Sequence, residues 1–359
     1  MRFCSVDYYR ALSPHSAFLL RWFVVLLTLF ITLSKLTDKG TVFQRHFYSK
    51  STVSKMAGKG TIFMPFSCTD KTSDPVDIGD FKCTLVGAYH KCPRNALESG
   101  QRCQIIRCQP KTDGRTTLWS CSAVGTLART NSSKDDQFVF HFWNASFGNG
   151  YTEFHAHYNE LMLSKACNIV AGSENRVYLE VDDSFIADLS QPNNPLIASH
   201  DDVAKLKIDG EEIWVPKKGL SYHSKFFDVF FNGDFKEKSE DCYELKDIKL
   251  EDFLPFLGIV HCLAVPIDEN SLEGLLKLGD FFRCKIVLDR CEEYLKNAPI
   301  KIFPLLKKLE LAEECKLKST LADVIGKAST VQLKRMTWEG EMSAYARSLM
   351  SLKFRLNDS

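Results

Sequence analysis

The sequence lacks an appreciable net charge, since 46 basic and 45 acidic residues leave a formal charge of +1. Without a global positive field, nucleic acid is not an expected partner. The sequence also lacks a phosphate-binding loop, a Gly-x-Ser-x-Gly nucleophile elbow and the spacing of a metalloprotease. Ser221, His223 and Asp228 lie close in sequence, but a catalytic triad is defined by geometry rather than by closeness along the chain. We therefore expect no intrinsic catalysis and no cofactor.

The thirteen cysteines lack the dense, even pattern of a disulfide framework. Because they are odd in number and scattered, we expect reduced thiols in a cytoplasmic or nuclear compartment. They also include no C-x-x-C pair, which leaves zinc coordination without a recognised spacing. Small half-buried thiols account for the cysteines of the middle region, which are Cys83, Cys92, Cys103, Cys108 and Cys121.

Two histidines of the middle region could still bind a metal. His155 and His157 flank one residue of an expected strand, which would place both imidazoles on one face, where His141 or Cys167 could complete a site. Strands carry histidine for many reasons, and no carboxylate or cysteine pair stands at a recognised spacing. The sequence therefore predicts no metal site.

One long hydrophobic run is present, from Ala17 to Leu33, broken only by Arg21. A spanning helix needs about 20 apolar residues and a signal-peptide core about 7 to 15, so the run falls between the two classes. Three interpretations remain open: a short membrane anchor, a targeting peptide, or part of an N-terminal extension, residues 1–60, that is absent from the working protein. Met56 follows the run and could begin a chain without it.

At 359 residues the chain should hold two or three domains. Its middle region shows strict alternation, as in Phe138, Phe140 and Phe142, which we expect on one buried face. Turn-forming clusters separate such runs, for example at Gly148-Asn149-Gly150. The pattern predicts an antiparallel β-sandwich over residues 78–188.

The segment from Lys205 to Val215 predicts a β-hairpin. Alternating apolar residues stand on both sides of Asp209-Gly210, a dipeptide typical of tight two-residue turns. Pro216 can occupy a first helical position, and Ser224 can cap the next helix, SKFFDVFF, which has an aromatic face. These helices should cover the hairpin.

Further along, a third strand and then several helices are expected. Residues 242–248 (CYELKDI) alternate as in a strand, and the spacing of apolar residues then changes to the helical period. The helical stripes comprise Phe253, Leu254, Phe256, Leu257 and Val260, then Leu272, Leu275, Leu276, Gly279 and Phe282, then Ile286, Val287, Cys291, Tyr294 and Leu295. A small sheet capped by helical hairpins follows from this order, and the predicted fold class is α+β.

This order of elements resembles a BTB (POZ) domain over residues 200–297. The segments DDV, DGEEIWVPKKGLSYHSKFFDVFF, YELKDI and LLKLGDFF carry the resemblance. The chain departs from the family pattern at Pro216-Lys217, where many members have His-Lys, and at residues 261–264, where many have a Tyr-Thr-Gly-like segment. The resemblance implies a homodimer, although the short, proline-containing SQPNNPLIASH stands where strongly dimeric members carry an amphipathic helix.

The β-rich region before it resembles the MATH domain of MATH-BTB adaptors, a family expanded in nematodes. The matching segments are FKCTLVGAY from Phe81 and the stretch from Phe138 through FGNGY to RVYLEV, which ends at Val181. The resemblance implies a sandwich that recognises a protein substrate, with a peptide groove that does not map onto particular residues here.

In ubiquitin-ligase adaptors of this family, the loop after the aromatic helix carries a hydrophobic-x-Glu motif that inserts against cullin-3. Phe235-Lys236-Glu237 stands at that place. An exposed aromatic can anchor in a partner pocket, and a carboxylate can fix the register. The resemblance therefore makes Phe235 and Glu237 candidate cullin-binding residues. The alternative is that Phe235 packs in its own core and Glu237 is merely solvated.

Two amphipathic helices are predicted over residues 300–330, and they resemble the helical pair after the BTB domain that extends the cullin contact. The first carries Phe303, Leu306, Leu309, Ala312 and Cys315, and the second Leu317, Leu321, Val324, Ile325 and Ala328. One further helix is expected in the tail, residues 331–359.

Together these observations predict a non-catalytic interaction adaptor, the substrate-recognition subunit of a cullin-3 ubiquitin ligase, with a protein substrate held by the MATH-like domain. A self-associating BTB scaffold without cullin binding is the alternative. Either would be cytoplasmic or nuclear, unless residues 17–33 anchor the chain in a membrane.

Overall fold

The computed structural model describes residues 58–65, 71–88, 92, 101–112, 114–131, 134–159, 174–233, 242–336 and 342–357. The chain divides into the units Met1–Thr52 and Val53–Ser359, and every described residue belongs to the second unit. The hydrophobic run at residues 17–33 lies outside the described residues. Among those that are described, no helix has both the length and the apolar content that a membrane crossing needs.

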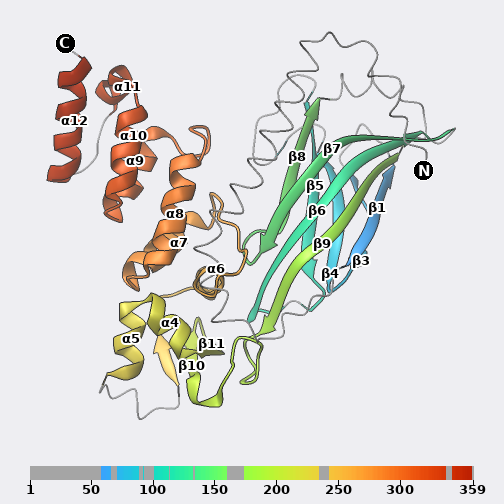
Figure 1. Cartoon of the computed structure of the whole chain (residues 1–359), viewed down its shortest axis with the longest axis horizontal. Coiled ribbons are helices and arrows are strands. Elements are labelled where there is room, and N and C mark those ends of the chain that lie inside the picture. The colour runs from blue at the N-terminus through green and yellow to red at the C-terminus, as the bar shows by residue number, and fades with distance from the viewer. Residues whose placement is uncertain are drawn as a thin grey trace, which may run out of the picture. The chain divides into compact units, whose positions relative to one another are not determined.

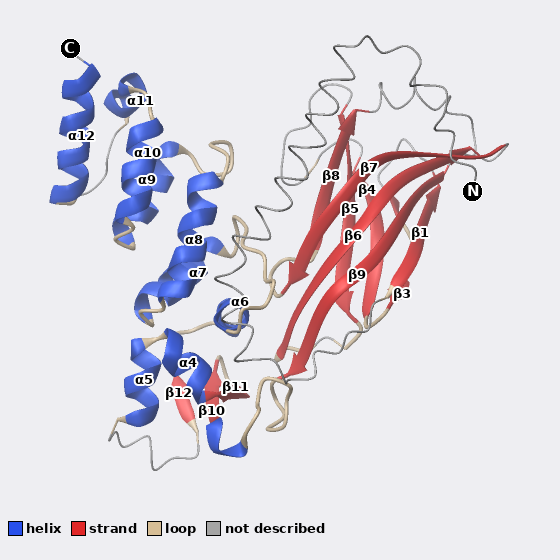
Figure 2. Cartoon of the chain, viewed as in Figure 1, coloured by secondary structure: helices blue, strands red, loops and turns tan. Residues whose placement is uncertain are grey.

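The β-rich region consists of two antiparallel sheets, drawn in red in Figure 2 and labelled in Figure 1. The first has the order β1-β9-β6-β7, with bounds β1 (Lys59–Pro65), β9 (Glu174–Asp188), β6 (Thr117–Asn131) and β7 (Lys134–Gly148). The second has the order β2-β4-β5-β8, with bounds β2 (Lys71–Thr72), β4 (Phe81–Ala88), β5 (Gln101–Pro110) and β8 (Glu153–Asn159). β3 (Val76–Ile78) also pairs with β4.

One face of each sheet packs into a shared core. β9 turns Val177, Leu179 and Val181 inward, as its alternation predicts, and β5 of the other sheet contributes Ile106. β1 pairs with β9 along its whole length, although it precedes the range 78–188 expected for this domain. The region is therefore the antiparallel sandwich that the sequence predicts.

The prediction that Phe138, Phe140 and Phe142 share a buried face is wrong. Phe140 packs against the core, whereas Phe142 is 78% exposed and Phe138 is 39% exposed. Opposite β7, the register shifts between Leu127 and Ala128 of β6, so that Phe140 has no opposing residue. Such a bulge exchanges the two faces of a strand and turns Phe142 outward.

The second region begins with the predicted hairpin, formed by β10 (Val203–Ile208) and β11 (Glu211–Pro216). Asp209 and Gly210 have φ values of 51° and 81°, the left-handed conformation that a tight two-residue turn requires. β12 (Tyr243–Leu245) adds to β10 in parallel and confirms the predicted third strand.

Within the described residues, five α-helices accompany this small sheet (Figure 1), where the sequence predicts helices. They are α4 (Lys217–His223), α5 (Lys225–Asn232), α6 (Leu250–Val260), α7 (Leu272–Phe281) and α8 (Lys285–Asn297). Pro216 ends β11 and directly precedes α4, one residue before the helical position expected for it.

An aromatic cluster forms the centre of this region. Phe227 of α5, Phe253 and Phe256 of α6, and Phe282 after α7 are all fully buried. The ring centroid of Phe282 lies 4.6 Å from that of Phe227 and 5.3 Å from that of Phe256. Because aromatic side chains bury large apolar areas, this cluster joins the three helices tightly.

The predicted helical pair follows as α9 (Leu305–Glu314) and α10 (Lys318–Lys327). The tail was expected to hold one helix, and this is wrong: it contains α11 (Thr330–Arg335) and α12 (Ala344–Asn357). Ser329 and Gln332 form a capping box that starts α11 directly after α10, and the chain is extended again at Met336. The α+β fold class is confirmed.

Candidate interaction surfaces

Ser224 fixes the start of α5, as the sequence predicts. Its Oγ accepts a hydrogen bond from the backbone N–H of Phe227 at 3.2 Å and so caps the helix. The same hydroxyl donates to the backbone carbonyl of Phe282 at 2.5 Å. One buried side chain therefore holds the beginning of α5 against the end of α7.

Ser224→Ala is expected to lower the free energy of unfolding by about 2 kcal/mol, because it removes a helix cap and leaves a buried carbonyl unsatisfied. Urea unfolding would measure the loss. A matched Ser348→Ala substitution, at an exposed hydroxyl of α12, should change stability by no more than about 0.5 kcal/mol. Equal stability of the Ser224→Ala and Ser348→Ala proteins would contradict this role for Ser224.

The outer side of α5 carries an apolar patch that continues onto α7. Phe226 and Phe230, four residues apart, lie half-buried with ring centroids 5.3 Å apart. Phe281 packs 5.6 Å from Phe226 and is 60% exposed, and Val229 is 48% exposed. We call these four side chains the α5–α7 patch. An exposed apolar group of this kind is a candidate protein-binding surface.

The candidate cullin-binding residues come directly after α5 in the chain. Phe235 and Glu237 lie outside the described residues, which resume at Cys242 before β12. The described part places the end of α5 at Gly233, whose N–H bonds to the carbonyl of Val229. Phe281 belongs to none of the helical stripes predicted from the sequence, whereas its neighbour Phe282 does. The Phe-Phe pair at the end of α7 was the available signal for an exposed aromatic side chain.

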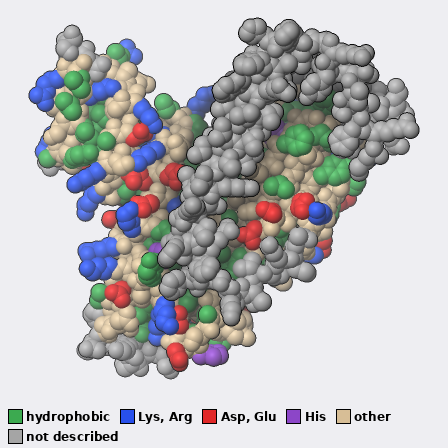
Figure 3. Space-filling view, in the orientation of Figure 1, with side chains coloured by type: hydrophobic (Ala, Val, Ile, Leu, Met, Phe, Trp, Pro, Cys, Tyr) green, Lys and Arg blue, Asp and Glu red, His purple; other side chains and the backbone are tan. Residues whose placement is uncertain are grey.

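A second apolar surface lies on the outer face of the sheet β1-β9-β6-β7. Thr61, Tyr178, Thr126 and Phe142 follow one another in register across its four strands. Beside this row Val124 is 44% exposed. In the view of Figure 3, hydrophobic side chains gather over this sheet, with acidic and basic side chains beside them. We call this surface the outer-face patch.

The outer-face patch is shallowly hollowed. A depression of about 430 Å³ is lined by Lys59, Gly60, Thr61, Val124, Gly125, Thr126, Tyr178, Leu179 and Glu180. Lys59 and Glu180 form an ion pair at its rim, with 2.8 Å between Nζ and Oε1. The depression thus offers backbone and apolar side chains inside a charged edge, which suits an extended peptide better than a charged small molecule.

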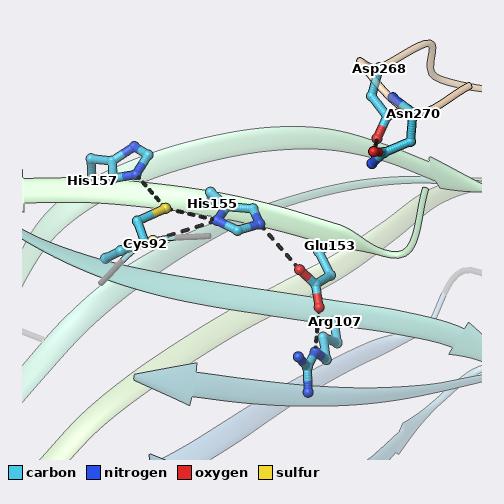
Figure 4. A network of polar contacts seen from close by, with 8 residues as sticks. Cys92, Arg107, Glu153, His155, His157, Asp268 and Asn270 are labelled. Atoms are coloured by element: carbon cyan, nitrogen blue, oxygen red, sulfur yellow. Dashed lines mark hydrogen bonds and ion pairs between the residues drawn. The ribbon is translucent and has the colours of Figure 1, made fainter. Parts of the chain in front are cut away.

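The structure brings His155 and His157 together on one face of β8, as predicted. Their neighbours are Cys92, which Figure 4 shows between the two rings, and Cys103. Cys167, named as a partner from the sequence, lies outside the described residues. The remaining cysteines of the middle region, Cys83, Cys108 and Cys121, are buried in the sandwich core. The grouping of these two histidines with Cys92 and Cys103 could not be predicted from the sequence, because β5 and β8 are far apart along the chain.

Burial dominates the electrostatics of this group. Burial, the neighbouring Cys92 and the charge of Glu153 raise the pKa of Cys103 well above its usual range. Burial lowers the pKa of His157, and a charge on His141 lowers it further. Burial alone would raise the pKa of Glu153, but its hydrogen bond and ion pair with Arg107 outweigh this and hold the pKa below the usual value.

Two of the three residues considered as a triad, Asp228 and His223, have structural contacts. Asp228 of α5 accepts a hydrogen bond from Asn232 Nδ2 at 2.9 Å. His223 of α4 packs edge-on against Tyr222, with ring centroids 4.9 Å apart. Ser221 lies on α4 two residues before His223, on the other side of Tyr222 in sequence. That the chain has no intrinsic catalysis stays a prediction.

Comparison with known proteins identifies the second region. A family model for the BTB/POZ domain matches residues 200–298. BTB and MATH domain-containing protein 38 of Caenorhabditis elegans is 27% identical over 197 residues, which are 53% of this chain and 50% of that protein. BTB and MATH domain-containing protein 36 of the same organism is 26% identical over 243 residues, 62% of this chain and 71% of that protein.

A vertebrate protein is similar over a shorter range. Kelch-like protein 26 of Danio rerio is 28% identical over 93 residues, 26% of this chain and 15% of that protein. The match to BTB and MATH domain-containing protein 38 spans half of that relative's length. The similarity to these two C. elegans proteins thus extends well beyond the length of the BTB domain. The similarity to the Kelch-like protein covers about the length of a BTB domain.

Proposed function

From the premise that residues 200–298 are a BTB domain, in a chain similar to BTB and MATH domain-containing proteins, we propose that this protein is a non-catalytic adaptor that brings a protein client to a cullin-3 ubiquitin ligase. The observation that carries the proposal is the order of parts in one chain: a β-sandwich, a BTB domain and a helical pair. Ubiquitin transfer would then be the work of other subunits.

The surface proposed for cullin-3 combines the α5–α7 patch with Phe235 and Glu237, which follow α5 in the chain. The half-buried rings of Phe226 and Phe230 provide apolar area, and the loop motif would add an aromatic anchor and a carboxylate. In protein interfaces, a small number of such anchor residues accounts for most of the binding energy.

α9 and α10 would extend this surface, because they are firmly attached to α8. The backbone N–H and hydroxyl of Thr320 both donate to Glu292 Oε1, at 2.9 and 3.1 Å. Lys308 Nζ donates to the carbonyl of Ala298 at 2.5 Å, at the end of α8. These bonds support a preorganised contact surface, which reduces the entropy lost on binding.

The client would bind the sandwich through the outer-face patch. Phe142 is 78% exposed there. Exposure of so large an apolar side chain forgoes the stabilisation that its burial in the core would give. A large exposed aromatic beside a peptide-sized depression supports a recognition role. The two proposed surfaces lie on different domains, as an adaptor requires.

Phe235→Ala combined with Glu237→Ala is expected to weaken cullin-3 binding by at least about 30-fold, or about 2 kcal/mol, because it removes the anchor and its charged neighbour. Titration calorimetry of the purified chain with cullin-3 measures the change. Lys236→Ala is the matched control, since it lies between the two residues at the variable position of the motif, and its dissociation constant should stay within a factor of about three.

Two results would contradict the proposal at different levels. Unchanged affinity of the double variant would remove the assignment of Phe235 and Glu237. Failure of the folded wild-type chain to bind would overturn the ligase role and favour the self-associating BTB scaffold, for which the α5–α7 patch is the candidate contact.

A further inference from the structure

Four side chains of the types that bind metal ions gather at the β5–β8 pair, on the face turned away from the sandwich core. Cys103 of β5 lies directly opposite His157 of β8, and His155 lies two residues earlier on the same strand. Ile106 and Ala156, of the alternate parity, belong to the sandwich core. Because successive side chains of a strand point to opposite faces, Cys103, His155 and His157 lie together on the outer face.

The fourth side chain comes from the connection between β4 and β5. Cys92 is only 3% exposed, and its sulfur reaches both imidazoles. We call Cys92, Cys103, His155 and His157 the β5–β8 cluster. Figure 4 shows the side chains of Cys92, His155 and His157 turned toward one another.

The distances among Cys92, Cys103 and His155 suit a metal site, and His157 contacts this group through Cys92, from where it could supply the fourth ligand. The Cys92 sulfur lies 3.2 Å from His157 Nε2 and 3.3 Å from His155 Nδ1. The Cys103 sulfur lies 3.7 Å from His155 Nδ1, and the ligand atoms of these two residues and Cys92 all lie within 4.8 Å of one another. With Zn–S of about 2.3 Å and Zn–N of about 2.0 Å, tetrahedral sulfur and nitrogen ligands lie about 3.5 Å apart.

A carboxylate behind His155 indicates which ring nitrogen faces the two sulfurs. His155 Nε2 lies 3.2 Å from Glu153 Oε2, and Arg107 Nε donates to Glu153 Oε1 at 2.7 Å. Because a carboxylate paired with arginine accepts hydrogen bonds, Nε2 carries the proton and Nδ1 presents its lone pair to the sulfurs. Metal-ligating histidines are typically oriented by a carboxylate in this way.

We propose that the β5–β8 cluster binds one zinc ion in closed, tetrahedral Cys2His2 coordination. Two thiolates and two imidazoles form a ligand set that zinc prefers, and the two negative sulfurs balance the charge of the ion. Four protein ligands leave no open position, so the role is structural: the ion ties the chain at Cys92 to β8, which is an edge strand. This inference is independent of the adaptor function.

The decisive measurement is the metal content of the full chain, purified under reducing conditions and dialysed against metal-free buffer. Inductively coupled plasma mass spectrometry should find about one zinc ion per chain. Exchange for cobalt(II) should give the intense visible absorption of a tetrahedral site together with a thiolate-to-cobalt charge-transfer band. A chain that retains no zinc and shows no such bands with cobalt would overturn the proposal and leave a thiol–imidazole hydrogen-bond network.

Variants separate a ligand from a residue that positions one. Cys92→Ser should abolish retention of zinc through dialysis. Glu153→Gln keeps all four ligands and should weaken zinc binding about 10- to 100-fold, measured by competition with a chromophoric chelator. It therefore tests the site even where Cys92→Ser fails to fold.

Two matched controls complete the test. Cys262→Ser removes an exposed thiol from the BTB domain, and His141→Asn removes a histidine close enough to affect His157 but outside the cluster. Both should bind zinc as tightly as the wild-type chain. Full retention by Cys92→Ser and unchanged affinity of Glu153→Gln would each overturn the assignment, as would equal loss in Cys262→Ser.

Discussion

Replacing Phe227 with alanine should lower the free energy of unfolding of the BTB domain by about 3 to 5 kcal/mol. Phe227 is fully buried on α5, with ring centroids of Phe282 at 4.6 Å and Phe231 at 5.6 Å. Because these neighbours are themselves packed, they cannot close the cavity that the missing ring leaves. Amide hydrogen exchange in α6 measures the effect, and exchange through global opening should become at least about 100-fold faster.

Val229→Ala is the matched control on the same helix. Val229 is 48% exposed, so its truncation should change stability by no more than about 0.5 kcal/mol. If α6 of the Phe227→Ala protein exchanged as slowly as that of the Val229→Ala protein, the aromatic cluster would not be the stabilising core of this domain.

These two substitutions are designed to separate effects on folding from effects on binding at α5. Phe227 and Phe231 are buried in the core, whereas Phe226 and Phe230 lie half-buried at its edge and Val229 is exposed. A variant that loses cullin-3 binding while keeping normal exchange in α6 therefore has a changed surface. A variant that loses both has a damaged fold, and its binding data say nothing about the interface.

The elements of the BTB domain could be predicted from sequence because short-range rules decide them. Asp209-Gly210 determines the hairpin turn, and Ser224 determines the start of α5. In the tail, Ser329 and Gln332 form a capping box that marks the start of α11, although it does not indicate where this helix ends.

The candidate sites depend on pairings between distant segments, which a single sequence does not reveal. The exposure of Phe142 follows from a bulge that is visible only in the register between β6 and β7. The β5–β8 cluster likewise requires Cys103 to lie opposite His157, a register set by the packing of the whole sheet. The sequence predicted no metal site because its cysteines and histidines show no recognised ligand spacing. Ligands contributed by separate strands do not follow such a local motif.

Acidification should destabilise the BTB domain through His261, which caps the C-terminal end of α6 and is 6% exposed. Burial and a charge on His223 lower the pKa of His261 from 6.5 to about 4. Between these two values the unfolded chain binds more protons than the folded one, so stability falls as the pH falls. Stability should be unaffected by His261 above about pH 6.5, and the loss should reach about 3 kcal/mol below about pH 4.

His261→Gln separates this contribution from those of the other histidines, because glutamine does not titrate. Burial also lowers the pKa values of His141, His157 and His223, so the wild-type chain and the variant share their part of the acid destabilisation. Urea unfolding of both proteins at about pH 7 and about pH 4.5 should show a smaller acid loss in the variant, by about 2.5 kcal/mol. Parallel losses in the two proteins would mean that His261 is protonated as readily in the folded BTB domain as in the unfolded chain, and another group would then have to account for the acid sensitivity.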